Sequence, residues 1–224
     1  MMKDFARPEG KLGRDLAELR FYAESRGADD ARIIPAAAVV VDPRVRFKCL
    51  IPRCYTVGAC SHCPPYGFSP RRTREIVSRY RFGIFFRVLV PSAHIAEATF
   101  PENYRQNTMD EEGNMLLMGV RFMLALTVVR LVEKLAHELG YRPTQGFAAG
   151  NCRDVFCRFQ PNCRKLASGG ECRHENLSIP SMESSGIDAM TMAARAGWDV
   201  YPVGGSTRPG DIPHGTYVGL VLVA

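Results

Sequence analysis

Eight cysteines are the side chains of this chain whose type and spacing point to chemistry. They fall into two groups of four. The first group has the spacing C-x4-C-x5-C-x2-C and consists of Cys49, Cys54, Cys60 and Cys63. The second has the spacing C-x4-C-x5-C-x8-C and consists of Cys152, Cys157, Cys163 and Cys172. Because the x4 and x5 intervals recur, we expect two related sites, each held mainly by one group.

Four thiolates suit a tetrahedral zinc ion or a [4Fe-4S] cluster. Zinc sites usually pair two C-x2-C units, and here only Cys60 and Cys63 form one. Loops of four and five residues are long enough to wrap the larger cluster. Cys63-Pro64 also matches the Cys-Pro of bacterial ferredoxins, where that cysteine ligates the other cluster. The spacing favours two [4Fe-4S] clusters over zinc, and it favours disulfides or free thiols least.

The rest of the composition favours a reducing, cytoplasmic location. The N-terminal residues MMKDFARPEGK lack the apolar stretch of a secretory signal. The most apolar segment, 114–139, is interrupted by charged residues, so it is not expected to span a membrane. In a reducing compartment, cysteines serve more often as metal ligands or redox groups than as disulfides.

Basic residues cluster around the first cysteine group. Seven of them and no acidic residue occur between positions 44 and 74, namely Arg44, Arg46, Lys48, Arg53, Arg71, Arg72 and Arg74. Such a segment could balance an anionic cluster and dock an acidic electron carrier or redox enzyme, or it could simply be a solvated face. Since thiolate ligands would offset much of the formal charge of +6, the basicity does not indicate nucleic-acid binding.

Two histidines and two carboxylates are secondary candidates. His62 and His174 lie beside cysteines and could replace a thiolate, but eight cysteines make this unnecessary. Glu183 and Asp188 could act as an acid–base pair, although a helix start explains this stretch more simply.

The remaining pattern predicts an α+β fold with a mixed sheet, a long central helix and two cysteine-rich loops. Helices are expected at 11–26, 69–80, 112–139 and 186–196, and strands at 33–41, 82–90, 144–150 and 217–223. Segment 112–139 is apolar on most of its circumference. It is therefore either central to the core or shared with a second copy in a homo-oligomer.

We expect a single domain over residues 1–224. A strand, four cysteines, a helix and a further strand occur before the long helix and again after it. This order suggests two related halves, 28–91 and 143–224, joined by that helix.

Two segments give the sequence a resemblance to a known family. CSHCPPYGFSPRRTREIVSRYRFGIFF and GECRHENLSIPSMESSGIDAMTMAARAGWDV resemble a prokaryotic family of predicted metal-binding, cysteine-rich proteins. The resemblance covers roughly residues 45–90 and 145–200 and implies metal binding without implying a reaction. In that family the later group is more compact, with C-x2-C units, so the spacing of Cys152, Cys157 and Cys163 departs from it.

The sequence thus predicts an iron–sulfur protein with two [4Fe-4S] clusters that relays single electrons. One alternative is an enzyme in which a cluster with an open iron binds substrate as a Lewis acid. The other is a zinc-stabilised binding module without redox activity.

Overall fold

The computed structural model describes residues 8–51, 53–54, 56–92, 114–157, 159–203, 207–208 and 210–224. Its centre is a sheet of four strands, β1 (Asp30–Pro35), β2 (Phe82–Pro91), β3 (Gln145–Ala148) and β4 (His214–Val223). The strand order is β1-β2-β4-β3. The α+β class is confirmed, but the prediction of a mixed sheet is wrong because all three strand pairings are antiparallel. The connections β1–β2 and β3–β4 join neighbouring strands, whereas the connection from β2 to β3 crosses over β4, which then pairs antiparallel with both β2 and β3.

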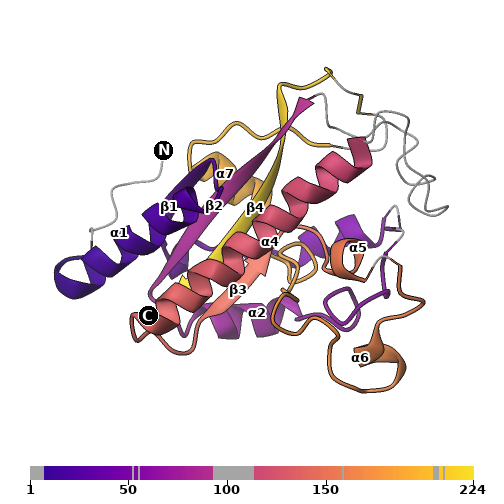
Figure 1. Ribbon diagram of the computed structural model, residues 1–224, viewed down its shortest axis with the longest axis horizontal. Helices are drawn as coiled ribbons and strands as arrows, with labels where there is room; N and C mark the ends of the chain where they lie inside the picture. The colour runs from indigo at the N-terminus through magenta and orange to yellow at the C-terminus, as the bar shows by residue number, and fades with distance from the viewer. Residues whose placement is uncertain are drawn as a thin grey trace.

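Helices cover both faces of the sheet (Figure 1). On one face α1 (Gly10–Ser25) and α4 (Asn114–Glu138) pack against β2 and β4 in one hydrophobic cluster. On the other face α2 (Pro70–Val77) and α7 (Ala189–Arg195) form a second cluster around Phe85, Trp198 and Leu220. Since both faces are covered, the central strands are apolar along most of their length.

The N-termini of α2 and α7 follow from their capping residues. Ser69 Oγ accepts a hydrogen bond from Arg72 N at 3.2 Å, and Pro70 occupies the first helical position. Asp188 Oδ1 accepts one from Thr191 N at 3.0 Å. Both bonds satisfy amide groups that a helix N-terminus leaves without partners, so these predicted helix starts are confirmed.

The first strand differs from its prediction. A strand was expected over 33–41, whereas β1 begins at Asp30 and ends at Pro35, where the short 3-10 helix η1 (Ala36–Ala38) follows. Proline has no N–H group to donate to a strand ladder, and it therefore terminates the pairing.

The long helix is central to the core. Leu126, Val129 and Val132 of α4 are buried against the sheet and α1. Of the two alternatives for this segment, a position central to the core is therefore the one observed. Residues 112 and 113 of the predicted helix lie outside the described residues. None of the helices in the described ranges is long and apolar enough to cross a membrane.

The element order repeats along the chain. The first set is the helix α1, the strand β1, a cysteine segment, the helix α2 and the strand β2. The second set is α4, β3, a cysteine segment, α7 and β4 in the same order. The second strand of each set lies at the centre of the sheet and the first lies at an edge. This arrangement agrees with the hypothesis of two related halves, which stays a hypothesis.

The crossing of α4 over the sheet depends on a glycine in β4. Gly219 lies opposite Phe86 in the β2–β4 ladder, and a Cβ atom built there would meet the Phe86 ring and come within 2.8 Å of Val129 Cγ2 of α4. Strand and helix therefore approach more closely than any side chain at this position would allow.

We expect Gly219→Ala to lower the free energy of unfolding by about 1–3 kcal/mol, the usual cost of overpacking a core. Gly119→Ala in α4 is the matched control, because a Cβ there meets nothing within 4 Å. It should stabilise the protein by up to about 1 kcal/mol through the helix preference for alanine. Urea unfolding of both variants checks this, and equal stabilities would contradict the close packing at Gly219.

Candidate metal centre

Cysteines from both groups meet in the interior. Cys60, Cys63 and Cys152 form one buried cluster, with Phe156 and Cys163 packed against it. The Sγ atoms of Cys60 and Cys63 are 3.4 Å apart, and Cys60 is only 1% exposed. Two groups about ninety residues apart in the sequence therefore contribute to a single site.

The turn from Cys60 to Cys63 aligns the first two thiols. Cys63 N donates to Cys60 O at 3.1 Å, and the amides of Tyr66 and Gly67 both donate to Cys63 O at 2.9 Å. A Cβ at Gly67 would lie 2.7 Å from His62 O, so the chain closes tightly behind the pair.

The loop that follows β3 delivers Cys152 to this pair. Gly150 has a positive φ of 75°, and a Cβ there would lie 2.7 Å from the Phe122 ring of α4. Glycine permits this backbone conformation at little cost, and the chain turns from the sheet into the cysteine cluster.

The same loop also contacts the segment that carries Cys49 and Cys54. Asn151 Nδ2 donates to Thr56 Oγ1 at 3.2 Å, and that hydroxyl lies 3.3 Å from Cys54 Sγ. Gly150 N donates to Glu183 Oε2 at 3.2 Å, and the Glu183 carboxylate acts electrostatically on Cys49. Residues 150–152 thus connect the first cysteine group to the second.

The other cysteines of the second group follow Cys152 in short helical segments and loops. The one-turn helix α5 (Arg153–Phe156) leads from Cys152 to Cys157, and α6 (Arg164–Ala167) begins directly after Cys163. Burial raises the pKa of Cys157, and the Cys152 and Cys172 thiols act in the same direction. Cys172 Sγ accepts a hydrogen bond from His174 N at 3.4 Å.

Contacts between thiols and burial together shift the pKa values of Cys60 and Cys152. Contact with Cys152 lowers the pKa of Cys60, but contact with Cys63 and burial outweigh it and leave that pKa at about 12. Contact with Cys60 and burial raise the pKa of Cys152 far above its usual value. Burial, followed by the Glu183 carboxylate, raises the pKa of Cys49 to about 11. A bound cation is the ordinary means of ionising thiols in such surroundings.

Each histidine beside a cysteine has another partner. His62 Nε2 lies 2.7 Å from Ser178 Oγ, which in turn donates to Cys152 Sγ at 3.6 Å. Burial lowers the pKa of His62 to about 4, and the positive charges of Lys165 and Arg130 act in the same direction. The His174 ring packs on Phe156 with centroids 5.7 Å apart. His62 therefore orients a hydroxyl toward the cluster and stays neutral.

An ion pair of α4 secures the segment that carries Ser178. Arg130 Nη1 lies 2.6 Å from Glu133 Oε2, and Arg130 Nη2 donates to the carbonyl oxygen of Ser178. The long helix of the core thereby fixes a hydroxyl that contacts the buried thiols.

Sequence reasoning missed several polar residues of the site. Thr56, Arg130 and Ser178 lie far apart in the chain and follow no periodic pattern. Asn151 could have been predicted as a residue of the site, because it directly precedes Cys152 in the sequence. The helix start expected at Ser185 and Asp188 is confirmed for Asp188, which caps α7, and is wrong for Ser185, which lies before the cap. Glu183 accepts hydrogen bonds from Gly150 N and Ser181 Oγ.

The donor chemistry fits a thiophilic metal. All eight cysteines are free thiols, and the distance between Cys60 Sγ and Cys63 Sγ is too long for a disulfide. Within the described ranges, no three His, Cys, Asp or Glu side chains are already arranged to hold a metal ion. The thiols that meet here would therefore have to reorient to coordinate one.

Most of the basic residues around the first group have partners. Arg44 pairs with Asp42, Arg71 and Arg72 pair with Glu75, and Arg74 donates to Val41 O. The two acidic partners lie just outside the stretch 44–74. The side chains of Arg46 and Arg53 form no ion pair or hydrogen bond with any residue that the structure describes.

Comparison with known proteins places the chain among predicted metal-binding proteins. A family model described as "Predicted metal-binding protein (DUF2284)" matches residues 32–223. The chain belongs to this family, as the resemblance in its cysteine segments indicated. No curated protein and no solved structure matches the chain.

Proposed function

We propose that the protein holds two [4Fe-4S] clusters with ligands drawn jointly from both cysteine groups, and that it relays single electrons. The observation that carries the proposal is the contact of Cys152 with Cys60 and Cys63. Sulfur donors select zinc and iron–sulfur clusters over hard cations, and eight thiols are enough for two four-cysteine clusters.

The packing of the thiols suggests how the ligands divide. Cys60, Cys63 and Cys152 would serve one centre, and Cys163, which packs against them, is the first choice for the fourth ligand. The other four cysteines would serve the second centre. This division revises the expectation that each group holds its own cluster. It also matches the crossed ligation of the Cys-Pro cysteine in two-cluster ferredoxins.

Neighbouring groups of the chain can tune such a centre. A bound [4Fe-4S] cluster takes up and releases one electron. Hydrogen bonds to the ligating sulfurs favour their ionised form, and three donors are in place: Ser178 Oγ to Cys152, His174 N to Cys172, and Thr56 Oγ1 beside Cys54. Burial of Cys60 and Cys63 keeps water away from the same site.

Metal analysis tests the composition. Protein purified anaerobically should contain about eight iron and eight sulfide per chain, on the rule of four cysteines per cluster. Stoichiometric zinc without sulfide would replace the iron–sulfur proposal with the zinc-stabilised module. About four iron would mean that only one centre is a cluster. Substrate-dependent changes in the spectrum of an incompletely ligated cluster would instead favour the enzyme.

Shared ligation is tested by a double substitution. Cys60→Ser and Cys152→Ser should each remove the same centre, about four of eight iron. The double variant should lose no more iron than either single variant, because both residues serve one centre. Iron analysis, with far-UV circular dichroism to confirm folding, provides the measurement. Loss of all iron from the double variant would mean that the two residues serve different centres.

The proposed partner is an acidic electron carrier or redox enzyme that docks near the first cysteine group. Phe47, Ile51 and Tyr66 are more than half exposed there, at 56%, 75% and 58%. Arg71 and Arg72 stand at the N-terminal end of α2, where positive charge opposes the helix dipole, although both pair with Glu75 one turn on. An apolar patch edged with basic residues suits a small, transient redox interface.

Charge reversal tests this docking. Arg71→Glu/Arg72→Glu should slow reduction by an acidic flavodoxin roughly tenfold or more at low salt, because steering acts on the association rate. The defect should shrink as salt rises, and metal content should not change. Arg14→Glu/Arg26→Glu, at α1 on the opposite face of the sheet, is the charge-matched control. Stopped-flow rates that do not depend on salt or on the α2 reversal would refute docking at this face.

A further inference from the structure

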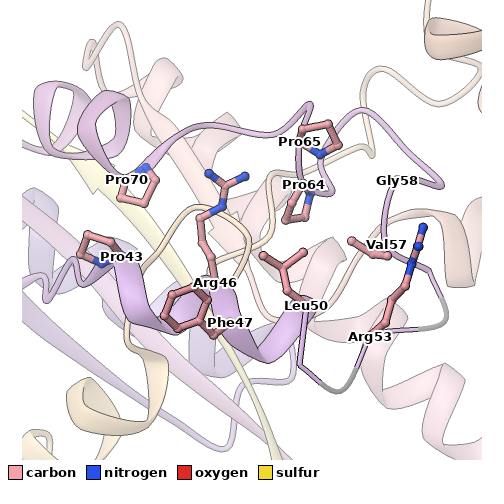
Figure 2. Close-up of a pocket in the computed structure, with 10 residues that line it drawn as sticks. All are labelled: Pro43, Arg46, Phe47, Leu50, Arg53, Val57, Gly58, Pro64, Pro65 and Pro70. Carbon is pink, nitrogen blue, oxygen red and sulfur yellow. The ribbon is translucent and has the colours of Figure 1, made fainter.

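A pocket of about 680 Å³ opens on the first cysteine segment (Figure 2). Four prolines line it together with Phe47, Leu50, Val57 and Gly58, and the charged residues among its described lining are Arg46 and Arg53. Its volume lies within the usual range for small-molecule sites, and proline-rich walls lose little conformational freedom on binding.

The pocket wall is continuous with the cysteine segment. Leu50 follows Cys49, Arg53 precedes Cys54, and Pro64 follows Cys63. A molecule held in the pocket would therefore lie against the backbone that carries three of the four cysteines of the first group.

The charge in the pocket is one-sided. No acidic residue is among those that line it, and Figure 2 shows the Arg46 guanidinium rising from η2 (Pro43–Cys49) toward Pro64, Pro65 and Pro70. Neither the Arg46 nor the Arg53 side chain has an ion-pair or hydrogen-bond partner among the described residues. A guanidinium beside apolar walls gains more from an anion than one in open water does, because the local dielectric constant is lower.

We propose that this pocket binds a small organic anion with an apolar, preferably planar body. Its carboxylate, phosphate or sulfonate would be held by Arg46, and its body would pack on Phe47, Leu50 and the prolines. Figure 2 shows the Arg53 guanidinium at the far end of the pocket, beyond Leu50 and Val57. A neutral molecule would leave the Arg46 charge unpaired, and an inorganic ion would leave the apolar walls uncovered. The inference goes beyond the proposed electron relay and does not depend on which metal the cysteines hold.

A pair of dyes that differ in charge tests the proposal on the full chain. 1-Anilinonaphthalene-8-sulfonate is the anionic probe, and N-phenyl-1-naphthylamine is its neutral counterpart. The wild-type protein should bind the sulfonate saturably at one site and the neutral dye more weakly. Arg46→Gln should weaken sulfonate binding by about tenfold and leave the neutral dye unaffected, since it removes a charge-assisted hydrogen bond, whereas Arg53→Gln should weaken sulfonate binding less. Phe47→Ala should weaken both dyes.

Arg71→Gln/Arg72→Gln is the matched control, because these arginines lie outside the pocket and pair with Glu75. It should leave both affinities unchanged. Equal wild-type affinity for the two dyes, or sulfonate binding insensitive to Arg46→Gln, would overturn the proposal. Metal content measured on the same preparations separates this outcome from failure of the proposed metal centre.

Discussion

The contact of Cys152 with Cys60 and Cys63 is the constraint on which the candidate site depends. It brings together residues about ninety positions apart in the sequence, and several distant elements are needed to hold it. Pairing of β3 with β4 sets the start of the 150–152 loop, and Phe122 of α4 leaves room only for glycine at position 150. Arg130 of the same helix then fixes the Ser178 segment over the thiols. The sheet and the long helix thus act as the support of a cysteine site.

Three buried thiols make an unusual core if packing is their only purpose. Free cysteine behaves as a small apolar residue, and a leucine or valine would fill such a space with more buried surface. The surroundings also include hydroxyls, an amide and a carboxylate at Ser178, Thr56, Asn151 and Glu183, all of which cost free energy to bury unless they are paired. A polar shell around soft donors is what a metal centre requires and what an apolar core avoids.

Local sequence signals predicted the elements well and the site only in part. The caps at Ser69 and Asp188 mark helix starts because a side-chain oxygen and the amides it satisfies are neighbours in sequence. The end of β1 at Pro35 was misjudged because hydrophobicity was given more weight than the missing proline N–H group. The contact between the two cysteine groups was not predicted. Cysteine spacing describes how one segment can wrap a metal, and it carries no information on which segments meet. Which segments meet is decided by sheet pairing and by the side-chain bonds of Thr56 and Ser178.

The charge counted along the basic stretch likewise does not predict the charge that a partner meets on the folded surface. Counted along the chain, residues 44–74 are uniformly positive, but folding brings Asp42 onto Arg44 and Glu75 onto Arg71 and Arg72. Exposed pairs of this kind contribute little to stability, yet they reduce the charge that a partner meets at close range. Among the residues that line the apolar pocket beside the cysteines, Arg46 and Arg53 have no carboxylate paired with them. On the two proposals, long-range attraction and short-range recognition would fall to different arginines: those of α2 would guide an acidic partner, and Arg46 would select an anion.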